Sequence, residues 1–100
     1  MNAHIDLDQR ALADFCRRNR IRRLSVFGSA LRDDFRPDSD VDFLVEFEPE
    51  ARVSLLDLIG MEIELGQIVG REVDLRTPLE LSPLFRDRVV AEAEVQYAAG

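Results

Sequence analysis

Apolar and polar residues follow one another along the chain with two different periods, and each period indicates one kind of secondary structure. Before residue 20 and again after Ser54, apolar residues recur at the spacing of amphipathic helices. Between these segments, a short apolar run and a strict apolar-polar alternation indicate strands. The pattern predicts helices over 8–19, 54–69 and from 82 onward, a short helical turn over 30–35, and strands over 24–28, 41–47 and 72–76.

The ends of these elements carry the residues that start and stop helices. Asp6 or Asp8 can cap the first helix, Ser54 the second, and Gly70 stands at the usual C-terminal glycine position. The Ser82-Pro83 pair is expected to open the last helix. For 94–97 the pattern leaves two alternatives, a continuation of that helix or a short edge strand. Strands that alternate with helices predict an α/β or α+β fold, with a small mixed sheet of three to four strands flanked by helices.

Length and composition narrow the class of protein. One hundred residues, 46% of them hydrophobic, are expected to form a single domain over 1–100. All 13 basic residues are arginine, which excludes a P-loop or Schiff-base lysine. A net charge of −7 argues against direct nucleic-acid binding. Cys16 is the only cysteine, which favours a cytoplasmic location, and the sequence contains neither a signal peptide nor a membrane span.

Six acidic residues crowd into the segment 28–47, and three of them, Asp40, Asp42 and Glu46, share one face of a predicted strand. Asp40 and Asp42 are two residues apart, so their Cα atoms are roughly 7 Å apart and both side chains leave the same face. Asp74 occupies an equivalent alternating position in the strand 72–76, and it joins the first two if that strand lies beside 41–47. Carboxylates without nearby His or Cys favour Mg²⁺ or Mn²⁺ over zinc.

Gly28 and Ser29 follow directly after the first predicted strand. Glycine allows close approach of a phosphate to the backbone, and the serine hydroxyl with the following helical turn can donate hydrogen bonds to it. The sequence therefore predicts a phosphate site beside the carboxylates. A calcium-binding EF-hand loop beginning at Asp38 is rejected, because its sixth and twelfth positions would be Phe43 and Pro49 instead of glycine and glutamate.

The pattern G-S-x10-D-x-D, formed by Gly28, Ser29, Asp40 and Asp42 and followed by an apolar run, resembles the minimal nucleotidyltransferase family of the polymerase-beta-like nucleotidyltransferase superfamily. The resemblance extends over nearly the whole chain. Asp74 matches the third carboxylate of the family. Arg32 matches a commonly basic position, whereas Asp33 stands where many relatives have glycine.

The resemblance implies transfer of AMP from ATP to a hydroxyl group, with two Mg²⁺ ions held by Asp40, Asp42 and Asp74. It further implies that Gly28, Ser29 and Arg32 bind the nucleotide phosphates. Family members of this size are usually encoded beside a HEPN-domain ribonuclease toxin, which they are thought to adenylylate as antitoxins. Two alternatives remain open: a binding module that neutralises its toxin by occlusion, and a nucleotidyltransferase acting on a small molecule such as an aminoglycoside.

The helix predicted over 54–69 carries two apolar stripes, where one suffices to cover a sheet. The first stripe contains Leu55, Leu56, Ile59 and Ile63, and the second contains Leu58, Met61, Leu65, Ile68 and Val69. The additional stripe either packs on a neighbouring helix or provides a surface for a partner or a homo-oligomer.

Overall fold

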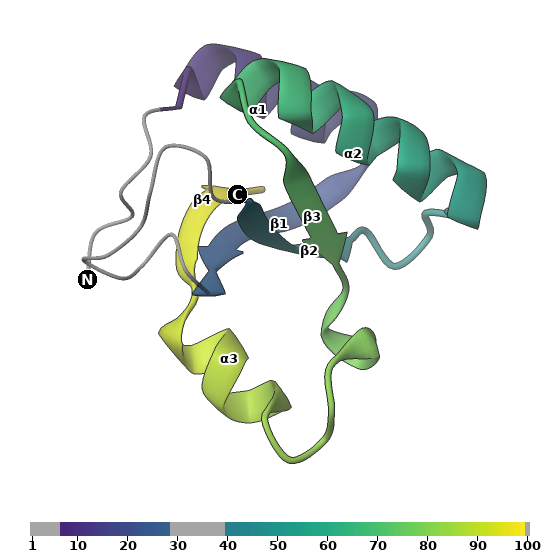
Figure 1. The fold of residues 1–100 in the computed structure, drawn as a ribbon. Helices are drawn as coiled ribbons and strands as arrows, with labels where there is room; N and C mark the ends of the chain where they lie inside the picture. Colours follow the sequence, from purple (N-terminus) through teal and green to yellow (C-terminus); the bar gives the residue numbers. More distant parts are fainter. Residues whose placement is uncertain (1–6, 29–39, 100) are drawn as a thin grey trace.

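The computed structural model describes residues 7–28 and 40–99 of the chain, and Figure 1 shows how their helices and strands are arranged. In chain order the elements are α1 (Gln9–Arg18), β1 (Ile21–Phe27), β2 (Val41–Phe47), α2 (Leu55–Val69), β3 (Val73–Arg76), the 3-10 helix η2 (Pro78–Glu80), α3 (Arg86–Glu92) and β4 (Glu94–Ala98). Among the described residues, no helix is long and apolar enough to cross a membrane.

The strands form one mixed sheet in the order β3-β2-β1-β4. β1 is antiparallel to both β2 and β4, whereas β3 is parallel to β2. Parallel neighbours need a crossover connection, and α2 provides it between β2 and β3. The predicted fold class, a small mixed sheet flanked by helices, is confirmed.

The predicted caps lie at the ends of the first two helices. The Asp8 carboxylate accepts hydrogen bonds from the backbone N–H groups of Arg10 and Ala11, which begins α1. Ser54 and Asp57 form a capping box at the start of α2. Gly70 ends α2 with a φ of 79°, a left-handed conformation that glycine adopts without steric cost.

Other predicted boundaries need correction. The last helix begins at Arg86 and not at Ser82, because the Ser82 carbonyl first closes a turn by accepting from the N–H groups of Phe85 and Arg86. β1 begins three residues before Leu24, at Ile21, and β3 begins at Val73. The segment 94–98 is the strand β4. The helical turn expected over 30–35 lies outside the described residues.

The hydrophobic core lies between the sheet and the pair α1 and α2, which run along the same side of it in Figure 1. Alternate residues of β2 point into this core, and Met61 and Leu65 of α2 meet them. Cys16 is fully buried there, and this burial raises the pKa of its thiol to about 12, so it is a core residue. The core residues are Leu12, Phe15, Cys16, Ile21, Leu24, Val26, Val41, Phe43, Val45, Met61, Leu65, Val73 and Leu75.

η2 and α3 lie on the opposite side of the sheet from α1 and α2 (Figure 1). Neither contains a buried residue. Polar contacts of Arg86 hold this segment together instead. Its Nε donates to the Pro78 carbonyl oxygen at 2.8 Å, and its Nη2 donates to the carbonyl oxygens of Leu79 and Leu81 at 3.4 and 3.1 Å.

Candidate functional site

The parallel pairing of β2 and β3 brings two of the predicted carboxylate residues side by side. Asp42 and Asp74 are register partners in the ladder. The Val41 N–H donates to the Glu72 carbonyl oxygen at 3.0 Å, which fixes this register at the start of both strands. Residues in register on neighbouring strands have side chains on the same face. The condition stated for Asp74, that its strand lies beside 41–47, is therefore met.

Asp42 lies in a strongly anionic environment. Partial burial raises the pKa of its carboxyl group above the usual range, and the negative charges of Asp74 and Asp40 raise it further, whereas the Arg76 guanidinium opposes the rise. Asp40 is exposed and directly precedes β2. A cation placed among these groups would relieve both the repulsion and the cost of burial.

Gly28 lies at the end of β1, against the same carboxylate. Its φ of 73° is in the left-handed region, and a side chain there would collide with the Asp42 Oδ2 atom. The preceding residue, Phe27, is the register partner of Asp42 across the antiparallel ladder. Glycine is thus required both by the backbone conformation and by the space. Ser29 and Arg32, the other predicted phosphate ligands, lie outside the described residues.

Arg76 is a residue of this face that the sequence reasoning did not assign. Its Nη2 atom donates to Asp74 Oδ2 at 3.1 Å, and its Nη1 atom lies 3.8 Å from Glu80 Oε2. The i, i+2 spacing of Asp74 and Arg76 on a strand was the available signal, because it places both side chains on one face.

Among residues 7–28 and 40–99, no group of three His, Cys, Asp or Glu side chains converges closely enough to hold a metal ion. The Asp74 carboxylate is instead directed to Arg76. The donors gathered near Asp42 are carboxylate oxygens, which are the ligands of Mg²⁺ and Mn²⁺, so the residues fit a hard divalent cation by type.

Comparison with known proteins identifies the family. The family model described as a nucleotidyltransferase domain matches residues 9–95. A candidate protein adenylyltransferase of Methanocaldococcus jannaschii is 44% identical over 73 residues, which are 73% of this chain and 76% of the relative. The protein adenylyltransferase MntA of Thermococcus cleftensis is 46% identical over 55 residues, covering 55% of this chain and 54% of the relative.

Solved structures share the fold. A candidate minimal nucleotidyltransferase superposes with a TM-score of 0.69 at 36% identity, over 85% of each chain. A toxin-antitoxin structure with AMP-PNP gives a TM-score of 0.72 at 18% identity, over 93% of this chain and 75% of that one. The second likeness concerns the fold alone. Because the family model matches residues 9–95, a range that contains Asp40, Asp42 and Asp74, this protein belongs to the nucleotidyltransferase family.

Proposed function

We propose that this chain is a Mg²⁺-dependent protein adenylyltransferase that transfers AMP from ATP to a hydroxyl group of a HEPN-domain toxin and thereby acts as its antitoxin. The observation that carries the proposal is the register pairing of Asp42 with Asp74, with Gly28 against the Asp42 carboxylate. Two relatives that cover more than half of this chain bear the name protein adenylyltransferase. Structural neighbours include MntA-HepT toxin-antitoxin structures.

Asp40, Asp42 and Asp74 are the proposed metal ligands, for two Mg²⁺ ions or Mn²⁺ in their place. Bound Mg²⁺ would neutralise the triphosphate and lower the pKa of the attacking hydroxyl. The raised pKa of Asp42 fits this role, because the carboxylate lies among negative neighbours that a cation would offset. Asp74 must exchange its ion pair with Arg76 for the metal, which leaves the Arg76 guanidinium available on the same face.

The remaining residues of the site orient the nucleotide. Gly28 exposes its backbone where β1 ends, and with Ser29 and Arg32 it is proposed to hold the outer phosphates. In the reaction, the acceptor oxygen forms a bond to the α-phosphorus, the bond to the pyrophosphate oxygen breaks, and the acceptor hydroxyl loses its proton. Asp74 is the proposed acceptor of that proton when the hydroxyl is not already ionised.

The test combines the purified chain with ATP labelled at the α-phosphate, Mg²⁺ and a purified HEPN-domain protein whose gene lies beside that of this chain. We expect label on the HEPN-domain protein, and Mn²⁺ should replace Mg²⁺. Asp40→Asn/Asp42→Asn should reduce labelling at least a hundredfold, since the proposed metal contributes several kcal/mol to the barrier.

Glu46→Gln is the matched control, because Glu46 lies on the same face of β2 but pairs with Arg22 and Arg23 at the other end of the strand. This variant should label normally. Toxin neutralisation without label, unaffected by the Asp40/Asp42 change, would assign the action to occlusion. Label found only on an aminoglycoside or another small molecule would reject the protein acceptor.

A further inference from the structure

The helix α2 has an apolar face that the described part of the chain leaves exposed. Leu55, Leu56, Ile59 and Ile63 expose 74, 79, 47 and 61% of their surfaces. The second stripe of the helix, with Met61 and Leu65 at its centre, already covers the sheet. We call the four exposed residues the outer face of α2. The outer face is therefore not needed to cover the core.

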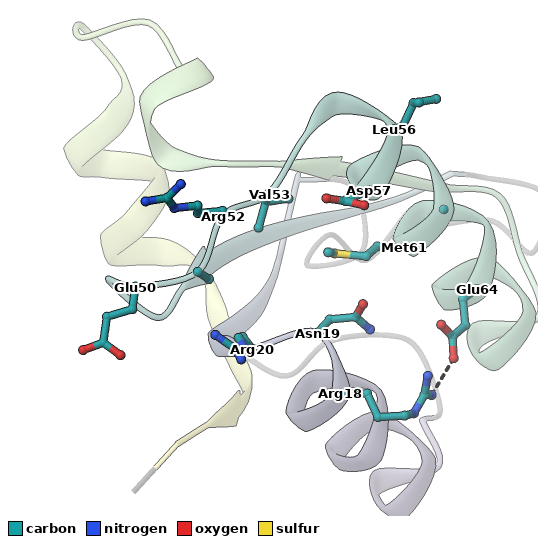
Figure 2. Close-up of a pocket in the computed structure, with 12 residues that line it drawn as sticks. Arg18, Asn19, Arg20, Glu50, Arg52, Val53, Leu56, Asp57, Met61 and Glu64 are labelled. Atoms are coloured by element: carbon teal, nitrogen blue, oxygen red, sulfur yellow. Dashed lines mark hydrogen bonds and ion pairs between the residues drawn. The ribbon is translucent and has the colours of Figure 1, made fainter.

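A cavity of about 770 Å³ adjoins this face, as Figure 2 shows. It lies between the N-terminal half of α2, the end of α1 and the segment 50–53. Leu56 belongs to both the outer face and the cavity wall. Gly60 also lines the cavity, and a methyl group at its Cα would meet nothing within 4 Å. A side chain of another molecule can thus enter beside α2.

The charges on α2 are all of one sign. Its residues include Asp57, Glu62 and Glu64 but no arginine. Glu62 accepts a hydrogen bond from the Leu75 N–H at 2.9 Å, and Glu64 pairs with Arg18. Arg20 and Arg52 lie across the cavity from α2 (Figure 2). Two copies that met through α2 would bring two acidic helices together, in a chain whose net charge is −7. The charge pattern therefore favours a partner with basic residues beside its apolar side chains.

We propose that the outer face of α2 docks an amphipathic helix of a protein partner, whose apolar side chains pack on the outer face and whose Arg or Lys residues lie beside the carboxylates of α2. Helices recognise apolar faces of this kind through side chains three and four residues apart. The proposal relies on the proposed function only in taking this partner to be the acceptor protein. The docking surface is distinct from the carboxylate site, since Asp40, Asp42 and Asp74 do not line the cavity.

The test uses a synthetic helical peptide of about five turns, with a leucine face flanked by arginines. Its binding to the whole chain is measured by titration calorimetry and by NMR shift mapping. We expect binding with shifts concentrated on α2 and around Gly60. Leu55→Ser/Leu56→Ser/Ile63→Ser should weaken binding at least tenfold, because each lost anchor contributes part of the contact energy. Exposed side chains tolerate serine, and a circular dichroism melt verifies the fold.

The matched control is Leu79→Ser/Leu84→Ser, which removes two leucines that are 82 and 87% exposed but lie outside α2. It should bind as the wild type does. A peptide with glutamates in place of the arginines should bind at least tenfold more weakly. Absence of peptide binding, equal binding by the α2 variant or equal binding of the glutamate peptide overturns the proposal.

Sedimentation decides between a partner and a second copy. A dimer of the unmodified chain that the α2 variant dissolves would assign the outer face to self-association and overturn the proposal, whereas a monomer supports it. These measurements involve no nucleotide, metal or toxin. A failure of the adenylylation assay therefore leaves their outcome unchanged, and their failure leaves the enzymatic proposal standing.

Discussion

The two sides of the sheet are covered by different kinds of contact. On one side, α1 and α2 enclose Phe15, Phe43 and Leu65, all of which are fully buried. On the other side, no residue of η2 or α3 is itself buried, although Leu44 of β2, opposite the core residue Phe43, is. The Arg86 guanidinium links η2 to α3 by donating hydrogen bonds to the carbonyl oxygens of Pro78 and Leu81. The carboxylates Asp42 and Asp74 belong to the strands between them.

The two sides of the sheet therefore differ in their contribution to stability and in how readily they open. Burial of apolar surface is the main favourable term in folding, so most of the free energy of unfolding derives from the α1/α2 side. The segment from η2 to α3 contains no buried residue and is held by a few polar contacts, which is typical of segments that open locally. In the proposed function the nucleotide binds at Asp42 and Asp74, so local opening of this segment would leave the core intact.

The largest expected effect compares two phenylalanines. Phe43→Ala should lower the free energy of unfolding by about 3–5 kcal/mol, because it leaves a cavity in the core. Phe85→Ala, where the ring is 58% exposed, should lower it by less than about 1 kcal/mol. Urea denaturation of both variants measures the difference. Equal losses would show that the η2–α3 side carries as much stability as the core.

The second comparison concerns two glycines. Gly28→Ala should destabilise the protein by about 1–3 kcal/mol and displace Asp42, because the positive φ and the nearby carboxylate both oppose a side chain. Gly60→Ala should instead stabilise it by about 0.5–1 kcal/mol, since Gly60 is within α2 with open space beside it. Thermal melts measure the stability change in both variants, and titration with Mg²⁺ measures whether Gly28→Ala has displaced Asp42. A stabilised Gly28→Ala variant would contradict the structure around Asp42.

The third prediction tests the hydrogen bonds of Arg86 with backbone carbonyl oxygens. Arg86→Ala should speed amide hydrogen exchange over 78–92 and cost about 1–2 kcal/mol in local stability, because hydrogen bonds to backbone carbonyls are lost. The core amides should keep their protection. The control is Arg88→Ala, which removes only an exposed pair with Glu92 and should change little. Unchanged exchange in the Arg86 variant would mean that another contact holds this segment.

The smallest effect is a pH dependence. Burial and the charges of Asp74 and Asp40 raise the folded-state pKa of Asp42, so the folded protein binds this proton more tightly than the unfolded chain. The stabilisation is present below the unfolded pKa and is lost as pH rises through the folded pKa. Metal-free Asp42→Asn should therefore melt higher than the wild type at neutral pH, with the gap closing in acid. Glu46→Gln should show no such gain. A difference in melting temperature between Asp42→Asn and the wild type that stays the same at every pH would contradict the expected linkage.

The sequence predicted the elements that have a strong period and clear caps. Asp8, Ser54 and Gly70 stand at the ends of α1 and α2 as expected, because capping depends on local hydrogen bonds. The predicted start of α3 was wrong, because a Ser-Pro pair can begin a turn as well as a helix, and Ser82-Pro83 begins the turn that precedes α3. Whether 94–98 extends a helix or pairs as a strand depends on β1, a contact that is distant in sequence.

In the candidate site too, local patterns predicted some features, whereas others depend on contacts between distant parts of the chain. The alternation along β2 was readable, and it placed Asp42 opposite the core residues Val41 and Phe43. The proximity of Asp74 required the parallel pairing with β3, which no local pattern specifies. The contact of Arg76 with Asp74 depends on which way two side chains turn on that face, and this is decided only in the folded chain.

The hydrogen bond from the Leu75 N–H to the Glu62 carboxylate has a consequence for assembly. β3 is an edge strand, and an unpaired N–H on such an edge is a template for strand addition by another chain. Glu62 occupies that donor from α2 and places a negative charge beside it. Fibre-like pairing along this edge is thereby opposed at the strand that carries Asp74.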